Sequence, residues 1–255
     1  RVVRSRYFSG GTLILPDRTV VAGALLVEDG CIAAVGRAAD LICPPGVERV
    51  DAGGGYIDPG YVDLHVHGGA GADFMDGTAE AWRRILKAHA RHGTTSLSPT
   101  TTVAAHHQIV AALDLAVVAV EQRGLGLWAG APGCRVLGAH CYGPYFAPGA
   151  EGCHPSAPLR VPAVGEYTEY LLREEAICSA TVAPELPGAE DFARAVVERG
   201  ICLNLGHTHA TFAEVEKALG WGACHVDHLY CAMSDKSKLR ALPGAPIYPM
   251  RGGVL

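Results

Sequence analysis

This sequence contains no long apolar run and no block of basic residues. No run approaches the ~18 consecutive apolar residues of a membrane-spanning helix, so we expect no transmembrane segment. The formal net charge is -5 without a cluster of Lys and Arg, which argues against a nucleic-acid partner. The first eleven residues include arginines but no apolar core, so we expect no secretory signal.

Paired cysteine motifs are also missing. The 9 cysteines stand singly along the chain, and none forms a CxxC pair. An odd number of scattered cysteines indicates reduced thiols rather than a disulfide framework, which predicts a cytoplasmic protein.

The remaining composition is that of a globular chain. Hydrophobic residues make up 49% and charged residues 18% of the 255 positions, enough for one large domain or one and a half. The 32 glycines and 16 prolines fit a chain with many tight junctions between strands, loops and helices.

Residues 1–58 predict a small β domain. Short apolar runs alternate there with turn signals, and the turn at Asp29-Gly30 has the pattern of a hairpin. The apolar runs are 12–15, 24–27 and 31–35.

From Pro59 onwards, strand-like runs alternate with helical stretches, which is the pattern of β/α units with a parallel sheet. We therefore expect residues 59–255 to form part of an α/β barrel of the (β/α)₈ type with about six strands present. The expected strands are 60–67, 93–102, 135–140, 176–183, 201–206 and 223–229, and the expected helices are 78–91, 103–122, 165–173, 191–199 and 211–219.

The stretch Asp63-Leu64-His65-Val66-His67-Gly68-Gly69 holds the first chemical signal. Residues two apart on a strand point the same way, so His65 and His67 share one face. Two imidazoles followed by flexible glycines suit a divalent metal at a strand end, although a pair of core or turn histidines fits the spacing as well.

Further polar residues fall at or just beyond the ends of the other expected strands. In a (β/α)₈ barrel these ends meet at one rim, where the functional residues gather. Core packing alone does not explain why six separate strands would each end in polar residues at one rim, so the pattern favours a metal site. Its members are His65, His67, Thr100–Thr102, His140, Glu185, His207 and His228.

Six segments in this order resemble the amidohydrolase superfamily, and within it the N-acetylglucosamine-6-phosphate deacetylases. They read PGYVDLHVHGG (59–69), GTTSLSPTTT (93–102), LGAHCYGPYFAP with GCHP (137–155), VAPE (182–185), LGHTHA (205–210) and HVDHLYCAM (225–233). The resemblance implies a metal-dependent barrel beside a small β-sandwich domain. It also implies hydrolysis of the acetamide of an amino sugar phosphate, in a cytoplasmic enzyme that forms a homodimer.

The resemblance also implies roles for particular residues. His65 and His67 correspond to a pair that binds one of two metals in many relatives, and His207 with His228 to a pair that binds the other. His154 corresponds to a histidine that contacts the sugar. The segment Cys231, Ala232 and Met233 corresponds to one that lines the substrate pocket.

The implied chemistry needs these residue types. Neutral imidazoles bind one or two divalent ions such as zinc or iron without choosing among them. The ion polarises the amide carbonyl and lowers the pKa of a water, and a carboxylate relays the proton to the departing nitrogen.

Tyr142 departs from the family pattern, in which a Glu metal ligand stands at this place. A phenol, with an ordinary pKa near ~10, binds a metal well only after losing its proton, so we expect weakened or altered metal binding. Tyr142 is either a ligand or a filler of the vacated position. Cys141 would be a surrogate thiolate, but strand alternation turns it to the other face.

Two other positions depart as well. Cys231 replaces an Asn and lacks the paired donor and acceptor of an amide. His209 stands where relatives usually have Asn, and is either an extra ligand or a loop residue.

The stretch 59–255 is shorter than the roughly 250 residues of a complete barrel. We expect the chain to be a fragment or a decayed copy, with the family's catalytic Asp beyond Leu255. Three hypotheses remain: this deacetylase, an amidohydrolase for another N-acyl or cyclic amide, or a non-catalytic binding protein.

Several residues keep two interpretations. Asp63 is a partner of a ligand histidine or a turn residue, and Glu185 touches the site or only ends a strand. Arg240 and Arg251 bind a sugar phosphate or are surface arginines. Asp227 alternates with His228, so we expect it to face the helices.

Overall fold

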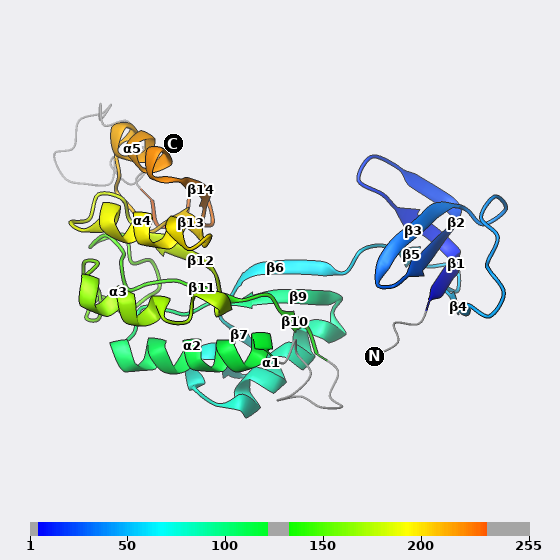
Figure 1. Ribbon diagram of the computed structural model, residues 1–255, viewed down its shortest axis with the longest axis horizontal. Helices are drawn as coiled ribbons and strands as arrows, with labels where there is room; N and C mark the ends of the chain where they lie inside the picture. Colours follow the sequence, from blue (N-terminus) through cyan, green and yellow to red (C-terminus); the bar gives the residue numbers. More distant parts are fainter. Residues whose placement is uncertain (1–4, 122–132, 234–255) are drawn as a thin grey trace. The chain divides into compact units, whose positions relative to one another are not determined.

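The computed structural model describes residues 5–121 and 133–233. Contacts divide the chain into two compact units, Arg1–Gly60 and Tyr61–Leu255, which are described separately (Figure 1).

The first unit contains a five-stranded mixed sheet in the order β3-β2-β1-β4, with β5 also pairing β1. Strands β1 to β3 are antiparallel neighbours, whereas β4 and β5 run parallel to β1. The strands are β1 (Arg6–Ile14), β2 (Thr19–Glu28), β3 (Cys31–Arg37), β4 (Glu48–Asp51) and β5 (Tyr56–Ile57).

The expected hairpin between β2 and β3 is confirmed. Glu28 pairs with Cys31, and Asp29 and Gly30 have φ values of 50° and 80°, as the common two-residue hairpin turn requires. Tyr7, Ala24 and Leu26 form a small core under the sheet. The second layer of a β-sandwich stays a prediction.

The second unit is built on parallel strands that follow the chain order. One sheet has the order β10-β9-β6 and another β11-β12-β13-β14, and a parallel backbone bridge between Thr100 and His140 connects them. Gly138, with φ 143°, separates β10 from β11, so these two short strands form one expected strand. The strands are β6 (Tyr61–Val66), β9 (Thr94–Pro99), β10 (Arg135–Val136), β11 (Ala139–Cys141), β12 (Ile177–Val182), β13 (Cys202–Leu205) and β14 (Ala223–Val226).

Helices connect these strands, as the alternation in the sequence predicts. Helix α1 packs on β9, α4 on β12 and β13, and α5 on β14, so the helices line one side of the strands (Figure 1). The helices are α1 (Ala79–Arg91), α2 (His106–Glu121), α3 (Val164–Leu171), α4 (Ala189–Glu198) and α5 (Phe212–Trp221). The short elements are β7 (Gly68–Gly69), β8 (Ala72–Asp73), η1 (Phe74–Asp76) and η2 (Glu174–Ala176).

The α/β class is thereby confirmed, and the expected helices and strands agree with the observed ones to within a few residues. A closed eight-stranded barrel stays a prediction. In the described ranges, every helix is too short or too polar to cross a membrane.

Alternation along the strands separates the core from the site. Val66, Val182 and Leu203 belong to the apolar core between the strands and the helices. Their neighbours in sequence point to the opposite face of the strands. That face carries His65, His140, Thr181 and Asn204.

Candidate metal centre

Four histidines from three strand ends lie in two close pairs. The Nε2 atoms of His65 and His67 are 3.3 Å apart, and those of His207 and His228 are 3.2 Å apart. The rings of His65 and His228 have centroids 5.4 Å apart, so the pairs share one cluster. Two atoms about 2.1 Å from one tetrahedral zinc ion are about 3.4 Å apart, so each pair has ligand-like spacing.

The orientation of His207 fits a metal ligand. Its Nδ1 lies 2.7 Å from the carbonyl oxygen of Ala150, which can only accept a hydrogen bond, so Nδ1 carries the proton. The lone pair is therefore on Nε2, which faces the cluster. The ring of Phe146 stacks on the imidazole at 4.0 Å and 13° and holds its plane.

The backbone at this pair has an unusual conformation. His207 and His228 have φ values of 50° and 23°, in the left-handed region that residues other than glycine rarely adopt. Such conformations persist where the surrounding structure imposes them, and they gather at functional sites.

Tyr142 occupies the space between His207 and His228. Its hydroxyl is in hydrogen-bonding contact with His207 Nε2 and lies 2.8 Å from His228 Nε2. Burial raises the pKa of Tyr142 above its ordinary value, so the phenol is neutral and donates its one proton to His207. The hydroxyl oxygen then accepts from His228 Nε2–H. These contacts support the interpretation of Tyr142 as a filler.

Cys141 points away from this cluster, as alternation predicts. Its side chain belongs to the apolar core beside the helices, and burial raises the pKa of its thiol to about 12. A protonated thiol in the core does not replace the missing carboxylate.

The expectation that Asp227 faces the helices is wrong. Asp227 is 2% exposed, and its carboxylate accepts hydrogen bonds from Thr181 Oγ1 at 2.5 Å and from Asn204 Nδ2 at 2.9 Å. Both donors lie on the inner face of the strands. The reason is that β14 ends at Val226 and the left-handed residue His228 turns the chain, so strand alternation no longer applies.

Asp227 also approaches two histidines of the inner face. Its Oδ2 lies 3.9 Å from His140 Nε2, and one ligand atom from each of His65, His140 and Asp227 lies within 4.8 Å of the other two. Sequence reasoning placed His140 at the rim but not among the ligands. The alternation of core and inner residues on β12 and β13 is the signal that would have drawn attention to Thr181 and Asn204.

Burial keeps the imidazoles of His65, His67 and His207 neutral. It lowers the pKa of His65 to about 4 and that of His207 to about 3, with neighbouring histidines adding to the effect. Burial also lowers the pKa of His67. Neutral imidazoles are the form that binds metal ions, so these three side chains are ready as ligands.

His154 lies at the same cluster. Its ring centroid is 5.6 Å from that of His67 and 5.2 Å from that of His207, and its Nδ1 is 2.6 Å from Thr102 Oγ1. The residue reaches this position from the long loop after β11. Contact with a sugar stays a prediction.

The segment after His228 returns to the loop that follows β13. The amide of Thr208 donates to the carbonyl of Ala232 at 3.1 Å. Met233 is buried and forms an isolated parallel β-bridge with Thr208. Cys231 is exposed. Roles of these three residues in substrate binding stay predictions.

Glu185 supports the site instead of lining it. Its carboxylate accepts hydrogen bonds from Thr208 Oγ1 and from the amide of His209, both at 2.5 Å, and so holds the loop next to His207. Asp63 Oδ1 accepts from the amide of His65 at 3.1 Å. Arg240 and Arg251 lie outside the described residues.

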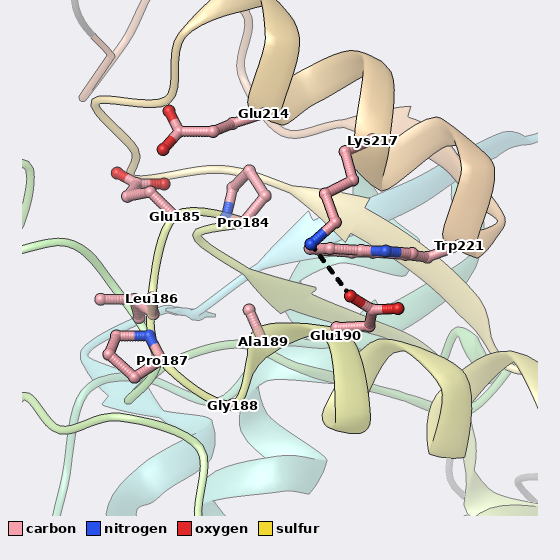
Figure 2. A pocket seen from close by; sticks show the side chains of 10 residues that line it. All are labelled: Pro184, Glu185, Leu186, Pro187, Gly188, Ala189, Glu190, Glu214, Lys217 and Trp221. Carbon is pink, nitrogen blue, oxygen red and sulfur yellow. Dashed lines mark ion pairs between the residues drawn. The ribbon is translucent and has the colours of Figure 1, made fainter.

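A hollow of about 380 Å³ lies beside helices α4 and α5 (Figure 2). Its lining includes Glu185 but none of the clustered histidines. Lys217 pairs with Glu190 at 3.1 Å and lies over the ring of Trp221, as Figure 2 shows. Lys217, the cationic side chain that lines this hollow, is therefore already paired with Glu190 and Trp221. The hollow is separate from the histidine cluster.

Comparison with known proteins finds deacetylases of amino sugar phosphates. The chain is 31% identical over 242 residues to the N-acetylglucosamine-6-phosphate deacetylase of Homo sapiens, covering 89% of this chain and 54% of that protein. It is 32% identical over 211 residues to the N-acetylgalactosamine-6-phosphate deacetylase of Escherichia coli O157:H7, covering 82% and 52%. No protein-family model matches the chain.

Solved structures that resemble this chain are also deacetylases of this kind. An N-acetyl-D-glucosamine-6-phosphate deacetylase variant from Mycobacterium smegmatis, in complex with N-acetyl-D-glucosamine-6-phosphate, superposes with a TM-score of 0.75 at 27% identity, covering 91% of this chain and 57% of that one. The enzyme from Pasteurella multocida shares the fold, with a TM-score of 0.79 at 24% identity, covering 98% and 60%. The resemblance seen in the sequence is confirmed, and the chain spans about half the length of the relatives it matches.

Proposed function

We propose, from the kinship of this chain with the sugar-phosphate deacetylases of the amidohydrolase superfamily, that it forms part of a metal-dependent deacetylase. The substrate would be N-acetylglucosamine-6-phosphate, and the products glucosamine-6-phosphate and acetate. The observation that carries the proposal is the convergence of His65, His67, His207 and His228 in one cluster, on a fold shared with these enzymes.

The residues present suit a divalent ion. Burial keeps His65 and His207 neutral, and the tautomer of His207 directs a lone pair into the cluster. A divalent ion bound there would supply Lewis acidity toward the amide carbonyl and acidify a water. Tyr142 places a protonated oxygen against both His207 and His228, so this pair does not hold an ion while the phenol stays in place.

The side chains around the cluster would orient the sugar. His154 projects from the loop after β11, and its contact with Thr102 fixes one ring nitrogen. The other nitrogen is then available to a hydroxyl of the substrate. The proposal includes a cytoplasmic location, in keeping with the 9 free cysteines, and a homodimer on the pattern that the resemblance implies.

Acetate release by the full-length protein tests the activity. The assay supplies N-acetylglucosamine-6-phosphate with zinc or iron, and compares the galactosamine isomer and the sugar without phosphate. We expect turnover of the phosphorylated glucosamine compound and a large loss without phosphate. Absence of acetate from every phosphorylated sugar at saturating metal would sink the proposal.

Tyr142 favours a second candidate, a non-catalytic protein that binds an amino sugar phosphate. Tyr142 stands in place of the carboxylate that the family uses as a metal ligand, which weakens metal binding by His207 and His228. The other histidines of the cluster keep their positions. Isothermal titration with the same sugar discriminates the two, because saturable binding without acetate release supports this candidate. Turnover of other N-acyl compounds would instead point to an amidohydrolase of different specificity.

A further inference from the structure

We infer that the divalent ion is held by His65, His140 and Asp227, and not by the pair His207 and His228. This inference deepens the proposed function, since it rests on the chain binding a divalent ion. The three residues come from β6, β11 and the end of β14, and one ligand atom of each lies within 4.8 Å of the other two.

The pair formed by His207 and His228 is already satisfied. The hydroxyl of Tyr142 contacts Nε2 of both rings and takes the place that a shared ion would need. An ion at that place would have to displace a buried phenol, which is only 1% exposed and is packed against Phe146. Between His140 and Asp227 lies the smaller hydroxyl of Thr181, which donates to Asp227 Oδ2 and contacts His140 Nε2.

His140 has a hydrogen-bonding capacity that the described residues do not use. The ring is 1% exposed, Nε2 lies 2.7 Å from Thr181 Oγ1, and Nδ1 is buried without a partner. Buried polar atoms are normally hydrogen-bonded, so an unpartnered one needs an explanation. Thr181 gives its one proton to Asp227, so without an ion Nε2–H of His140 donates to Thr181. An ion bound at Nε2 would replace this one hydrogen bond and move the ring proton to Nδ1, where no described contact is lost.

Hydrogen bonds hold the carboxylate of Asp227 in place, as is usual for carboxylates that bind metal ions. Thr181 and Asn204 donate to its two oxygens and fix its orientation, and such outer partners are typical of metal sites. Gly206 makes room for this arrangement, because a Cβ there would lie 2.9 Å from Asp227 Oδ2. A larger residue at this position would push the carboxylate away from His140.

The donor set selects the class of ion. Two imidazoles and one carboxylate suit a first-row divalent transition ion such as zinc, iron or manganese, and such a triad leaves positions open for water or substrate. Magnesium and calcium prefer oxygen ligands throughout, so they fit poorly.

Zinc binding to the purified protein tests the site. Equilibrium dialysis compares wild type with Asp227→Asn, His140→Gln and His207→Gln. Asp191→Asn, at an exposed position of helix α4, is the matched control for the lost charge. We expect about one zinc per chain, affinity weaker by at least about tenfold for the first two variants, and unchanged binding for His207→Gln and Asp191→Asn. Unchanged binding in Asp227→Asn together with loss in His207→Gln would overturn the site.

X-ray absorption of the wild-type zinc complex gives an answer that no folding defect of a variant can affect. The site predicts two imidazoles and additional oxygen ligands, whereas three or more imidazoles would contradict it. Failure of wild type to bind zinc also contradicts it. Zinc bound as expected without acetate release by the full-length protein would leave the site standing and reject the deacetylase activity, so the two failures are distinguishable.

Discussion

At the scale of single residues, Tyr142 decides how the cluster is used. A carboxylate at this position would bring a negative charge and only acceptor oxygens between His207 and His228. The phenol brings a proton instead, and burial raises its pKa further above the ordinary value. One substitution therefore turns a pair with ligand spacing into a hydrogen-bonded pair.

We predict that Tyr142→Glu creates a second zinc site. The carboxylate replaces the phenol between the two imidazoles, so zinc stoichiometry should rise from about one to about two per chain. Equilibrium dialysis followed by metal analysis measures this change. Tyr142→Phe removes the hydroxyl without adding a ligand, and it should stay at the wild-type stoichiometry. An unchanged stoichiometry in a folded Tyr142→Glu protein would contradict the prediction.

At the scale of elements, the loop after β11 depends on helix α3. Glu166 on α3 accepts hydrogen bonds from Arg160 Nε at 2.6 Å, from Tyr145 at 2.9 Å and from Tyr170 at 3.0 Å. Arg160 and Tyr145 belong to the loop that begins at Tyr142. This network therefore anchors the segment that carries both Tyr142 and His154.

We predict that Glu166→Gln lowers the free energy of unfolding by about 1–3 kcal/mol at pH 7, because it removes charged hydrogen bonds. Burial acts to raise the pKa of Glu166, but the hydrogen bonds from Arg160 and Tyr145 outweigh it, and the pKa lies below its ordinary value. A lowered carboxyl pKa contributes stability that is complete above the unfolded value and is lost as the pH falls through the folded one.

The difference between Glu166→Gln and wild type should therefore shrink as the pH falls below the ordinary glutamate value. Urea unfolding at pH 7 and at acidic pH measures it. Glu175→Gln, at an exposed position, serves as the matched control and should differ little from wild type at either pH. A difference that is independent of pH would count against the role of the carboxylate charge.

Helix α5 begins with a capping box next to the loop of His207. Thr211 Oγ1 accepts from the amide of Glu214, and Glu214 Oε2 accepts from the amide of Thr211 at 2.7 Å. We predict that Thr211→Ala destabilises the protein by about 1 kcal/mol, since one amide of the first turn loses its partner. Thermal unfolding measures the loss, and Thr211→Ser should retain most of the stability. Equal losses in both variants would mean that the methyl group matters more than the cap.

At the scale of the whole molecule, an apolar edge is exposed on the second unit. In the described residues β6 pairs only with β9, and Val62 and Leu64 on β6 are 58% and 54% exposed. An open edge with apolar side chains is a template for pairing with another chain.

We predict that the 255-residue polypeptide expressed by itself self-associates through β6 and releases no acetate. Light scattering after gel filtration should show oligomers, and the double change Val62→Lys and Leu64→Lys should raise the monomer fraction several-fold. Ile42→Lys is the matched control, because Ile42 is an 85% exposed apolar residue outside the strands. A monomeric wild type, or an equal response to the control, would refute the role of the edge.

The sequence by itself determined the α/β alternation, the six parallel strands and the convergence of His65, His67, His207 and His228. Hydrophobic periodicity and strand alternation are local properties, so they are readable without coordinates. Alternation also placed Cys141 correctly on the helix side. The same rule failed at Asp227, because the strand ends one residue earlier and the chain turns.

Only the tertiary structure decided which groups touch. The contacts of Tyr142 with His207 and His228, and of Asp227 with Thr181 and Asn204, join residues that are distant in sequence. Their geometry depends on the positions of neighbouring strands and on left-handed backbone at His207 and His228, which no local pattern encodes. A strand pattern tells which face a side chain takes, whereas the packing of several strands sets what it meets there.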